Sequence, residues 1–184
     1  MITVKNREYF LIELRKVVYR PCIGVEIGVL RGDFTEMIFH FIEPTHFILV
    51  DPFRKNGVMY GEGVGYLPTA YSTDEDYEFV CKRFADKKMF HIIRQYSYDA
   101  VKCFTKRTMD FIYIDASHKY EDIKRDLEDW RPIVTKTGYI CGHDYIDHPE
   151  FGVKQAVDEF CAEHNFEMII FNENGGDYAL RAIQ

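Results

Sequence analysis

Five short apolar runs alternate with helical patterns along this chain, and this alternation constrains the fold more than any other feature. The runs are rich in β-branched or aromatic residues, and each is followed by glycine or polar residues. They span residues 22–27, 47–50, 89–93, 109–114 and 138–141. Buried strands separated by helices form parallel sheets through right-handed crossovers. The pattern therefore predicts an α/β, doubly wound fold with five parallel strands.

Helical spacing of apolar residues predicts what lies between and around these strands. An amphipathic N-terminal helix is expected over residues 5–19, as part of an N-terminal segment 1–20. The same spacing predicts a helix that begins near residue 33 and further helices over 73–85, 119–133 and 153–164. A short helix that ends at residue 104 is also expected. Two further strands, 167–171 and 178–183, flank a glycine- and asparagine-rich hairpin signal. We therefore expect one domain, 1–184, closed by a C-terminal antiparallel hairpin.

Length and charge narrow the class of protein. The chain has 184 residues, enough for one domain with a full core, and a net charge of -7. This acidity argues against binding to nucleic acid. We found no apolar run long enough for a membrane span and no signal peptide. The five cysteines are scattered, which argues against disulfides or structural zinc. We expect a cytoplasmic protein without membrane or nucleic-acid partners, and we keep a homo-oligomer as an option.

Residues 52–72 differ from the rest of the chain. They hold four glycines and three tyrosines in a stretch without strand or helix periodicity. A loop of this length is uncommon unless it is functional or disordered. We interpret it as a lid or substrate-recognition loop, although loop statistics alone favour a loop without a functional role about equally.

Polar or glycine residues follow each predicted strand, at the edge where ligands bind in doubly wound folds. Any one of these residues alone would be unremarkable, but an equivalent position after every strand indicates a shared site. The set consists of Gly28, Asp51, Ser97, Asp115 and the pair His143-Asp144.

Three of the residues near the first two strands each have a functional and a structural interpretation. Gly28 lets a ligand approach the backbone, or simply makes a turn. Asp51 can accept hydrogen bonds from both hydroxyls of a ribose, or it can cap the next turn together with Pro52. Glu26, inside its strand, can hold an ammonium group or anchor a neighbouring loop. Together Gly28 and Asp51 favour a nucleoside cofactor, although the glycine-rich dinucleotide fingerprint is incomplete.

At these motifs the chain resembles the class I S-adenosylmethionine-dependent methyltransferases. VEIGVLRG is similar to their first motif, ILVD to their second, and FEMIIF with YALRAI to their added antiparallel strand. The stretch YIDASHKYEDIKRDLEDWRPIVTKTGYICGHDY resembles the macrocin O-methyltransferase and Methyltransf_24 type more narrowly. The resemblance covers nearly the whole chain except the first twenty residues and the 52–72 loop. It implies a Rossmann-like seven-stranded methyltransferase fold and S-adenosylmethionine as cofactor.

The resemblance also implies residue roles. Glu26 and Gly28 match the methionine side of the cofactor site, and Asp51 matches the ribose carboxylate. Tyr96 and Ser97 match the adenine-side turn, where Gln95 and Tyr96 replace the frequent Gly-Asp and Tyr96 can stack on the base. The full cofactor set that we predict is Glu26, Gly28, Asp51, Pro52, Tyr96, Ser97, Asp115 and Ala116.

Metal and catalytic roles follow from the same comparison. Asp115 and the pair His143-Asp144 occupy the positions at which catechol-type O-methyltransferases bind a divalent metal. Mg²⁺ prefers oxygen ligands, so His143 suits a transition metal better. His118 lies where those enzymes place a catalytic lysine and is a reasonable general base, although a lone histidine at a helix start is more often a surface residue. We assign His118, Asp115 and Asp144 as catalytic.

These observations predict an enzyme that methylates the hydroxyl of a small molecule, such as a sugar, phenol or natural product. The reaction can run with or without a divalent metal. The alternative is a subunit or sensor that binds the nucleoside cofactor without turnover. An NAD-dependent oxidoreductase is disfavoured because the glycine fingerprint is incomplete.

Overall fold

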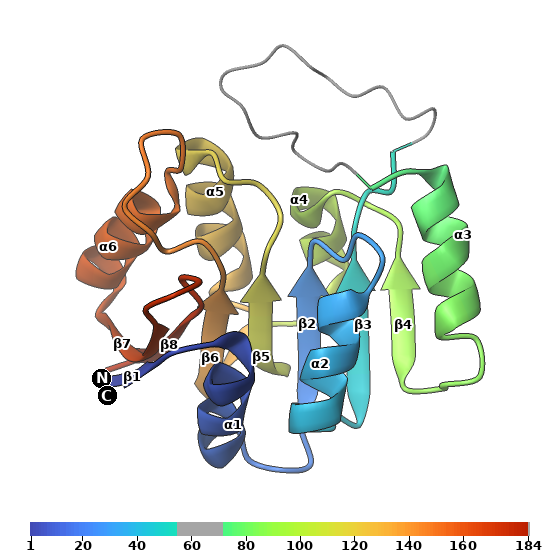
Figure 1. Cartoon of the computed structure of the whole chain (residues 1–184), viewed down its shortest axis with the longest axis horizontal. Helices are drawn as coiled ribbons and strands as arrows, with labels where there is room; N and C mark the ends of the chain where they lie inside the picture. Colours follow the sequence, from blue (N-terminus) through green and yellow to red (C-terminus); the bar gives the residue numbers. More distant parts are fainter. Residues whose placement is uncertain (55–71, 184) are drawn as a thin grey trace.

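The protein is an α/β sandwich with one eight-stranded sheet, described here for residues 1–54 and 72–183 of a computed structural model (Figure 1). The strands are β1 (Ile2–Val4), β2 (Ile23–Ile27), β3 (His46–Val50), β4 (Phe90–Ile93), β5 (Met109–Ile114), β6 (Val134–Gly142), β7 (Phe166–Asn172) and β8 (Tyr178–Ala182). The helices are α1 (Arg7–Val17), α2 (Asp33–Ile42), α3 (Asp74–Arg83), α4 (Ser97–Ala100), α5 (Tyr120–Trp130) and α6 (Val153–His164), with a 3₁₀ turn at Val101–Cys103.

The sheet order is β1-β7-β8-β6-β5-β2-β3-β4, and among the described strands only β8 runs antiparallel to its neighbours. The five predicted parallel strands and the antiparallel hairpin are therefore confirmed. The chain reverses direction across the sheet between β2 and β5. Strands β3 and β4 extend the sheet to one side, after which the chain crosses back to β5 and β6. In this class of fold, ligands bind beside that reversal.

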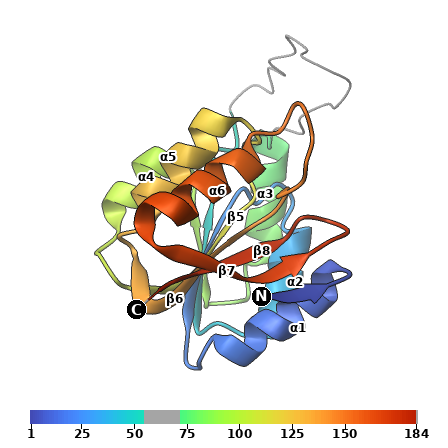
Figure 2. The ribbon, with the colours of Figure 1, turned by 90° about the vertical axis from the view of Figure 1, so that its left-hand side faces the viewer.

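Helices cover both faces of the sheet, as the two views in Figures 1 and 2 show. Helices α1, α2 and α3 lie on one face, and α4, α5 and α6 lie on the other. The buried sides of α1 and α5 illustrate the spacing behind the prediction: Phe10, Leu11 and Leu14 in one, Ile123 and Leu127 in the other. Because β5 is covered on both faces, its last four residues are all at most 1% exposed, which explains its unbroken apolar run.

The element ends differ from the predictions for local reasons. The N-terminal helix is shorter than predicted because the side chain of Asn6 caps it by accepting a hydrogen bond from the Tyr9 backbone N–H at 2.9 Å. Residues 2–4 form β1, an edge strand that the sequence did not indicate because three residues are too few to show an alternation. Thr73 and Asp76 form a capping box at the start of α3.

Most of the 52–72 segment, from 55 to 71, lies outside the described residues, so its lid or recognition role is a prediction only.

Candidate active site

The site is built around the junction of β2 and β5, where Gly28 and Asp115 follow adjacent strand ends. The Asp115 backbone N–H donates to the Ile27 carbonyl at 2.8 Å, which holds the two loops together. Gly28 has a φ of 89°, and a β-carbon there would lie 2.0 Å from the Asp115 carbonyl oxygen. Glycine is therefore required at this position by the protein itself, in addition to any ligand.

Asp51, at the end of β3, is a buried carboxylate that organises the glycine loop. One of its oxygens accepts the Val29 and Leu30 backbone N–H groups at 2.8 and 3.1 Å. The other accepts from the Phe53 backbone at 2.9 Å and from the Ser72 hydroxyl. The turn-capping interpretation is thus present in the structure. Only 4% of the residue is exposed, and both of its carboxylate oxygens have partners within the protein. Ribose binding at Asp51 stays a prediction.

Glu26 lies beneath the glycine loop, only 1% exposed, and accepts a hydrogen bond from the Thr35 hydroxyl at 2.5 Å. This contact ties β2 to the first turns of α2, which is the anchoring role considered for Glu26. Burial raises the pKa of Glu26 to about 8, although the Thr35 hydrogen bond opposes the shift. The carboxyl group is therefore mostly protonated near neutral pH in the cofactor-free protein.

This shift predicts a pH dependence of stability. The pKa of Glu26 is raised above its unfolded value of about 4.5, so the folded state binds the proton more tightly. The stability that this provides is complete below pH 4.5 and is lost as the pH rises toward 8. Glu26→Gln keeps the Thr35 bond without the charge. We expect the unfolding free energy of this variant, measured in urea, to increase relative to that of wild type by up to a few kcal/mol between pH 5 and pH 8.

Glu78→Gln, at an exposed position of α3, is the control and should follow the wild-type curve. A constant difference between Glu26→Gln and wild type across this pH range would contradict the shift.

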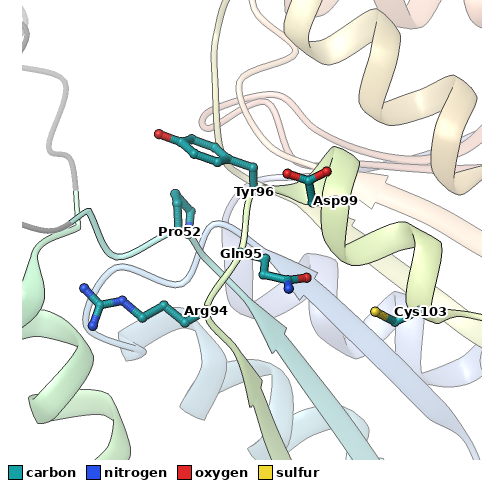
Figure 3. Close-up of a pocket in the computed structure, with 6 residues that line it drawn as sticks. All are labelled: Pro52, Arg94, Gln95, Tyr96, Asp99 and Cys103. Carbon is teal, nitrogen blue, oxygen red and sulfur yellow. The ribbon is translucent and has the colours of Figure 1, made fainter.

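A pocket of about 480 Å³ opens beside the ends of β3 and β4 (Figure 3). Tyr96 is 42% exposed, and its ring stacks on Tyr98 with centroids 5.3 Å apart, which fixes a flat aromatic surface at the pocket. The structure thus brings two of the predicted cofactor residues, Pro52 and Tyr96, to one pocket, and their contact with the cofactor stays a prediction. The lining residues are Pro52, Arg94, Gln95, Tyr96, Asp99 and Cys103.

Ser97 starts α4 beside this pocket, and its side chain has a different partner. Its hydroxyl donates to Asp126 of α5, a residue only 4% exposed. Burial raises the pKa of Asp126 to about 6, against the effect of the Ser97 bond. The prediction did not include Asp126, because its spacing along α5 gave no sign that it supports the turn after β4.

Four side chains from the ends of β5 and β6 form the polar half of the site. His118 Nε2 lies 2.7 Å from Asp144 Oδ2, and His143 Nδ1 lies 3.1 Å from the same oxygen. His143 Nδ1 is also 3.8 Å from Asp115 Oδ1. All the catalytic and metal candidates predicted after these two strands therefore lie together.

The electrostatics of this group favour the ion-pair form. Although burial opposes it, hydrogen bonds from His118 and His143 hold the pKa of Asp144 well below its usual range. The bond to Asp144 raises the pKa of His118, against the effect of burial. The pKa of His143 is also raised, since Asp144 and Asp115 outweigh its burial. The two carboxylates thus stabilise charged imidazoles around them.

These residues also offer a donor set for a metal. Asp115, His118 and Asp144 each provide one ligand atom, all within 4.8 Å of one another. The predicted set had His143 in place of His118, and both imidazoles lie beside Asp144. Two carboxylates with an imidazole suit a divalent transition metal, so the residues present fit such an ion.

The sequence prediction missed Arg7, the first residue of α1. Its Nη2 lies 3.0 Å from Asp115 Oδ2 and 2.9 Å from the Tyr113 hydroxyl. Its Nε donates to Asp177 Oδ1 at 3.0 Å. Asp177 is fully buried and also accepts from Tyr113 and from the Asn172 amide. No local pattern could have identified this network, because Arg7 and Asp177 are 170 positions apart.

Fold and site together define an S-adenosylmethionine-dependent methyltransferase architecture. Residues 25–145 match the Methyltransf_24 family, described as "Methyltransferase domain", and this match covers more than half of the chain. The protein therefore belongs to that family, whose cofactor is S-adenosylmethionine. The matched range begins in β2 and ends after β6, so α1, β7 and β8 lie outside it.

Solved structures with this fold are named as methyltransferases of several kinds. A proposed rRNA methylase from Clostridium thermocellum has a TM-score of 0.69 at 13% identity, with 100% of this chain and 99% of that chain covered. A proposed caffeoyl-CoA O-methyltransferase from Staphylococcus aureus has a TM-score of 0.66 at 11% identity, covering 98% and 86%. A tRNA methyltransferase from B. subtilis reaches 0.61 at 9% identity, covering 100% and 68%. At these identities the likeness shows the fold alone.

These neighbours bear on the predicted partners. Since RNA methylases share the architecture, the fold alone does not separate small-molecule acceptors from RNA. No curated protein sequence matches the chain. Within the described ranges, no helix is long and apolar enough to cross a membrane.

Proposed function

We propose that this protein transfers the methyl group of S-adenosylmethionine to a hydroxyl oxygen of a small molecule. The observation that carries the proposal is the His118–Asp144 pair, held beside Asp115 at the reversal of the sheet. This is the arrangement of a base with its orienting carboxylate. The net charge of -7 favours a small acceptor over RNA.

His118 is the residue that we assign to remove the proton from the acceptor. Its Nε2 is engaged by Asp144, while its Nδ1 makes no hydrogen bond to any residue in the described ranges. The ring is 30% exposed and lies flat against Phe151, with centroids 4.5 Å apart. In the neutral form of His118, Nε2 keeps its proton for Asp144, and Nδ1 is the nitrogen available to a bound hydroxyl. Asp144 stabilises the imidazolium that forms after proton transfer, consistent with the raised pKa of His118. Bound S-adenosylmethionine would supply an electrophilic methyl group for the deprotonated oxygen, and S-adenosylhomocysteine would be the leaving group.

A divalent metal would be held by Asp115, Asp144 and an imidazole of His118 or His143. Such an ion would lower the pKa of an acceptor hydroxyl that it bound. A histidine that coordinates the metal cannot also act as the free base. His118 as base and His118 as ligand are therefore alternative versions of the same proposal.

The decisive variant is Asp144→Ala. We expect methyl transfer to fall about 100-fold or more, because His118 loses its orienting partner and any metal loses a ligand. The measurement is transfer of labelled methyl groups to a panel of phenols, sugars and RNA, with chelator or with Mg²⁺ or Mn²⁺. Stimulation by the ion in wild type, and its loss in the variant, would support the metal version.

Asp147→Ala, an exposed position on the same loop, is the control and should keep full activity. Unchanged activity and ion response in Asp144→Ala would refute this role of Asp144. Calorimetric binding of S-adenosylmethionine without transfer to any acceptor would instead support a cofactor-binding subunit. Transfer to RNA alone would overturn the small-molecule assignment.

A further inference from the structure

Arg7 is a cation held in a fixed orientation beside Asp115, one of the predicted cofactor residues. Its Nε and Nη2 are tied to Asp177, Tyr113 and Asp115 at 2.9–3.0 Å. The guanidinium carbon also lies 3.6 Å from the centre of the Phe34 ring, so the plane of the group packs on an aromatic surface. Contacts from several directions leave this side chain little freedom.

The same contacts leave part of the guanidinium unused. An arginine side chain has five N–H donors. The hydrogen bonds of Arg7 involve only Nε and Nη2, and within the described ranges Nη1 has no hydrogen-bond partner. The side chain is 30% exposed, so this end of the group can meet a ligand. Two oriented donors on a permanent cation suit a carboxylate.

The neighbours of Arg7 indicate which carboxylate it would meet. Phe34 is the second residue of α2, directly after the glycine loop, and Asp115 directly follows β5, so both lie near the sheet reversal. Glu26 lies under the same loop, close enough for the charge of Arg7 to act on it. Glu26 is the residue predicted to meet the ammonium of the methionine part of the cofactor. The carboxylate of that zwitterion requires a cation nearby.

We propose that Arg7 binds the α-carboxylate of S-adenosylmethionine through its Nη1 donors, and so selects cofactors that carry this carboxylate. The inference rests on the proposed function, because it assumes that S-adenosylmethionine binds. It assigns a ligand contact to α1, a helix that lies outside the matched methyltransferase range.

The test compares two ligands and two protein forms by calorimetry without any acceptor. The ligands are S-adenosylmethionine and its decarboxylated analogue, which keeps the sulfonium and ammonium groups. We expect wild type to bind the carboxylated form about 10- to 100-fold more tightly, as for a hydrogen bond to a charged group. In Arg7→Met this preference should vanish, with the affinity for the decarboxylated ligand changed less than about threefold.

Arg7→Lys restores a cation and should recover part of the preference. Arg15→Met is the matched control, on the same helix. Among residues 1–54 and 72–183, the only hydrogen bond of its side chain goes to the Val18 carbonyl. Circular dichroism and urea unfolding show whether each variant is folded. Should Arg7→Met fail to fold, the comparison of ligands in wild type and Arg7→Lys still decides.

The outcomes separate this inference from the proposed function. Equal affinity of wild type for both ligands would overturn the role of Arg7 while leaving methyl transfer intact. An equal loss of both affinities in Arg7→Met would also overturn it, because Arg7 would then act only by holding Asp115 in place. Failure of wild type to bind either ligand would refute the proposed function itself.

Discussion

Replacing Gly28 with alanine is expected to lower the free energy of unfolding by about 3–5 kcal/mol, at the upper end for single substitutions. Two effects add. The φ of 89° is a backbone conformation that costs an L-residue about 1–2 kcal/mol. The new β-carbon would also lie 2.0 Å from the Asp115 carbonyl oxygen and 2.6 Å from its carbonyl carbon, so relief of the clash requires a shift of the backbone after β5. Urea unfolding followed by circular dichroism measures the loss.

Gly175→Ala is the matched control for this prediction. Gly175 is not at positive φ, and the nearest atom to its β-carbon would be the Asn172 side-chain nitrogen at 3.0 Å, so a displacement of a few tenths of an ångström relieves the contact. We expect it to cost less than about 1 kcal/mol. Wild-type stability in Gly28→Ala would mean that the strand ends are further apart than described.

Asp115→Asn is expected to reduce kcat/KM for methyl transfer by about 100-fold or more without unfolding the protein. The substitution removes the charge that pairs with Arg7 at 3.0 Å and faces His143 at 3.8 Å, and it weakens the candidate metal site. The fold should survive because Asp115 is 25% exposed and its backbone bond to Ile27 is unaffected. Steady-state kinetics with labelled cofactor provides the measurement.

Asp86→Asn removes a carboxylate from an exposed turn after α3 and should leave kcat/KM unchanged. An Asp115→Asn enzyme with more than a tenth of wild-type activity would remove Asp115 from the catalytic assignment.

The sequence allowed the fold and one half of the site to be predicted, because both depend on local patterns. Buried strands carry apolar runs, and the residue after each run lies at one edge of the sheet. Asp115, His118, His143 and Asp144 could be grouped in this way before any distance was known. Element ends were less accurate: α5 ends at Trp130, before Pro132, rather than at residue 133.

The other half of the site depends on contacts that no local pattern encodes. Asp51 was recognisable as a polar residue after a strand, but its use by the Val29 and Leu30 backbone was not. Arg7 was one of several charged residues on an amphipathic helix. Its partner Asp177 was hidden in a glycine-rich hairpin signal. Only the pairing of β1 with β7 and the docking of α1 bring these two together.

The Arg7–Asp177 ion pair has a consequence for how this family can diversify. The residues on its two sides come from opposite ends of the chain, and both lie outside the matched range of 25–145. The shared domain thus contributes Asp115, while the flanking segments decide which cation meets it. A relative with the same central domain and different flanks would present another charge to the residue after β5. Grafting the flanks of one such protein onto the centre of another would therefore change the charge that lies beside Asp115.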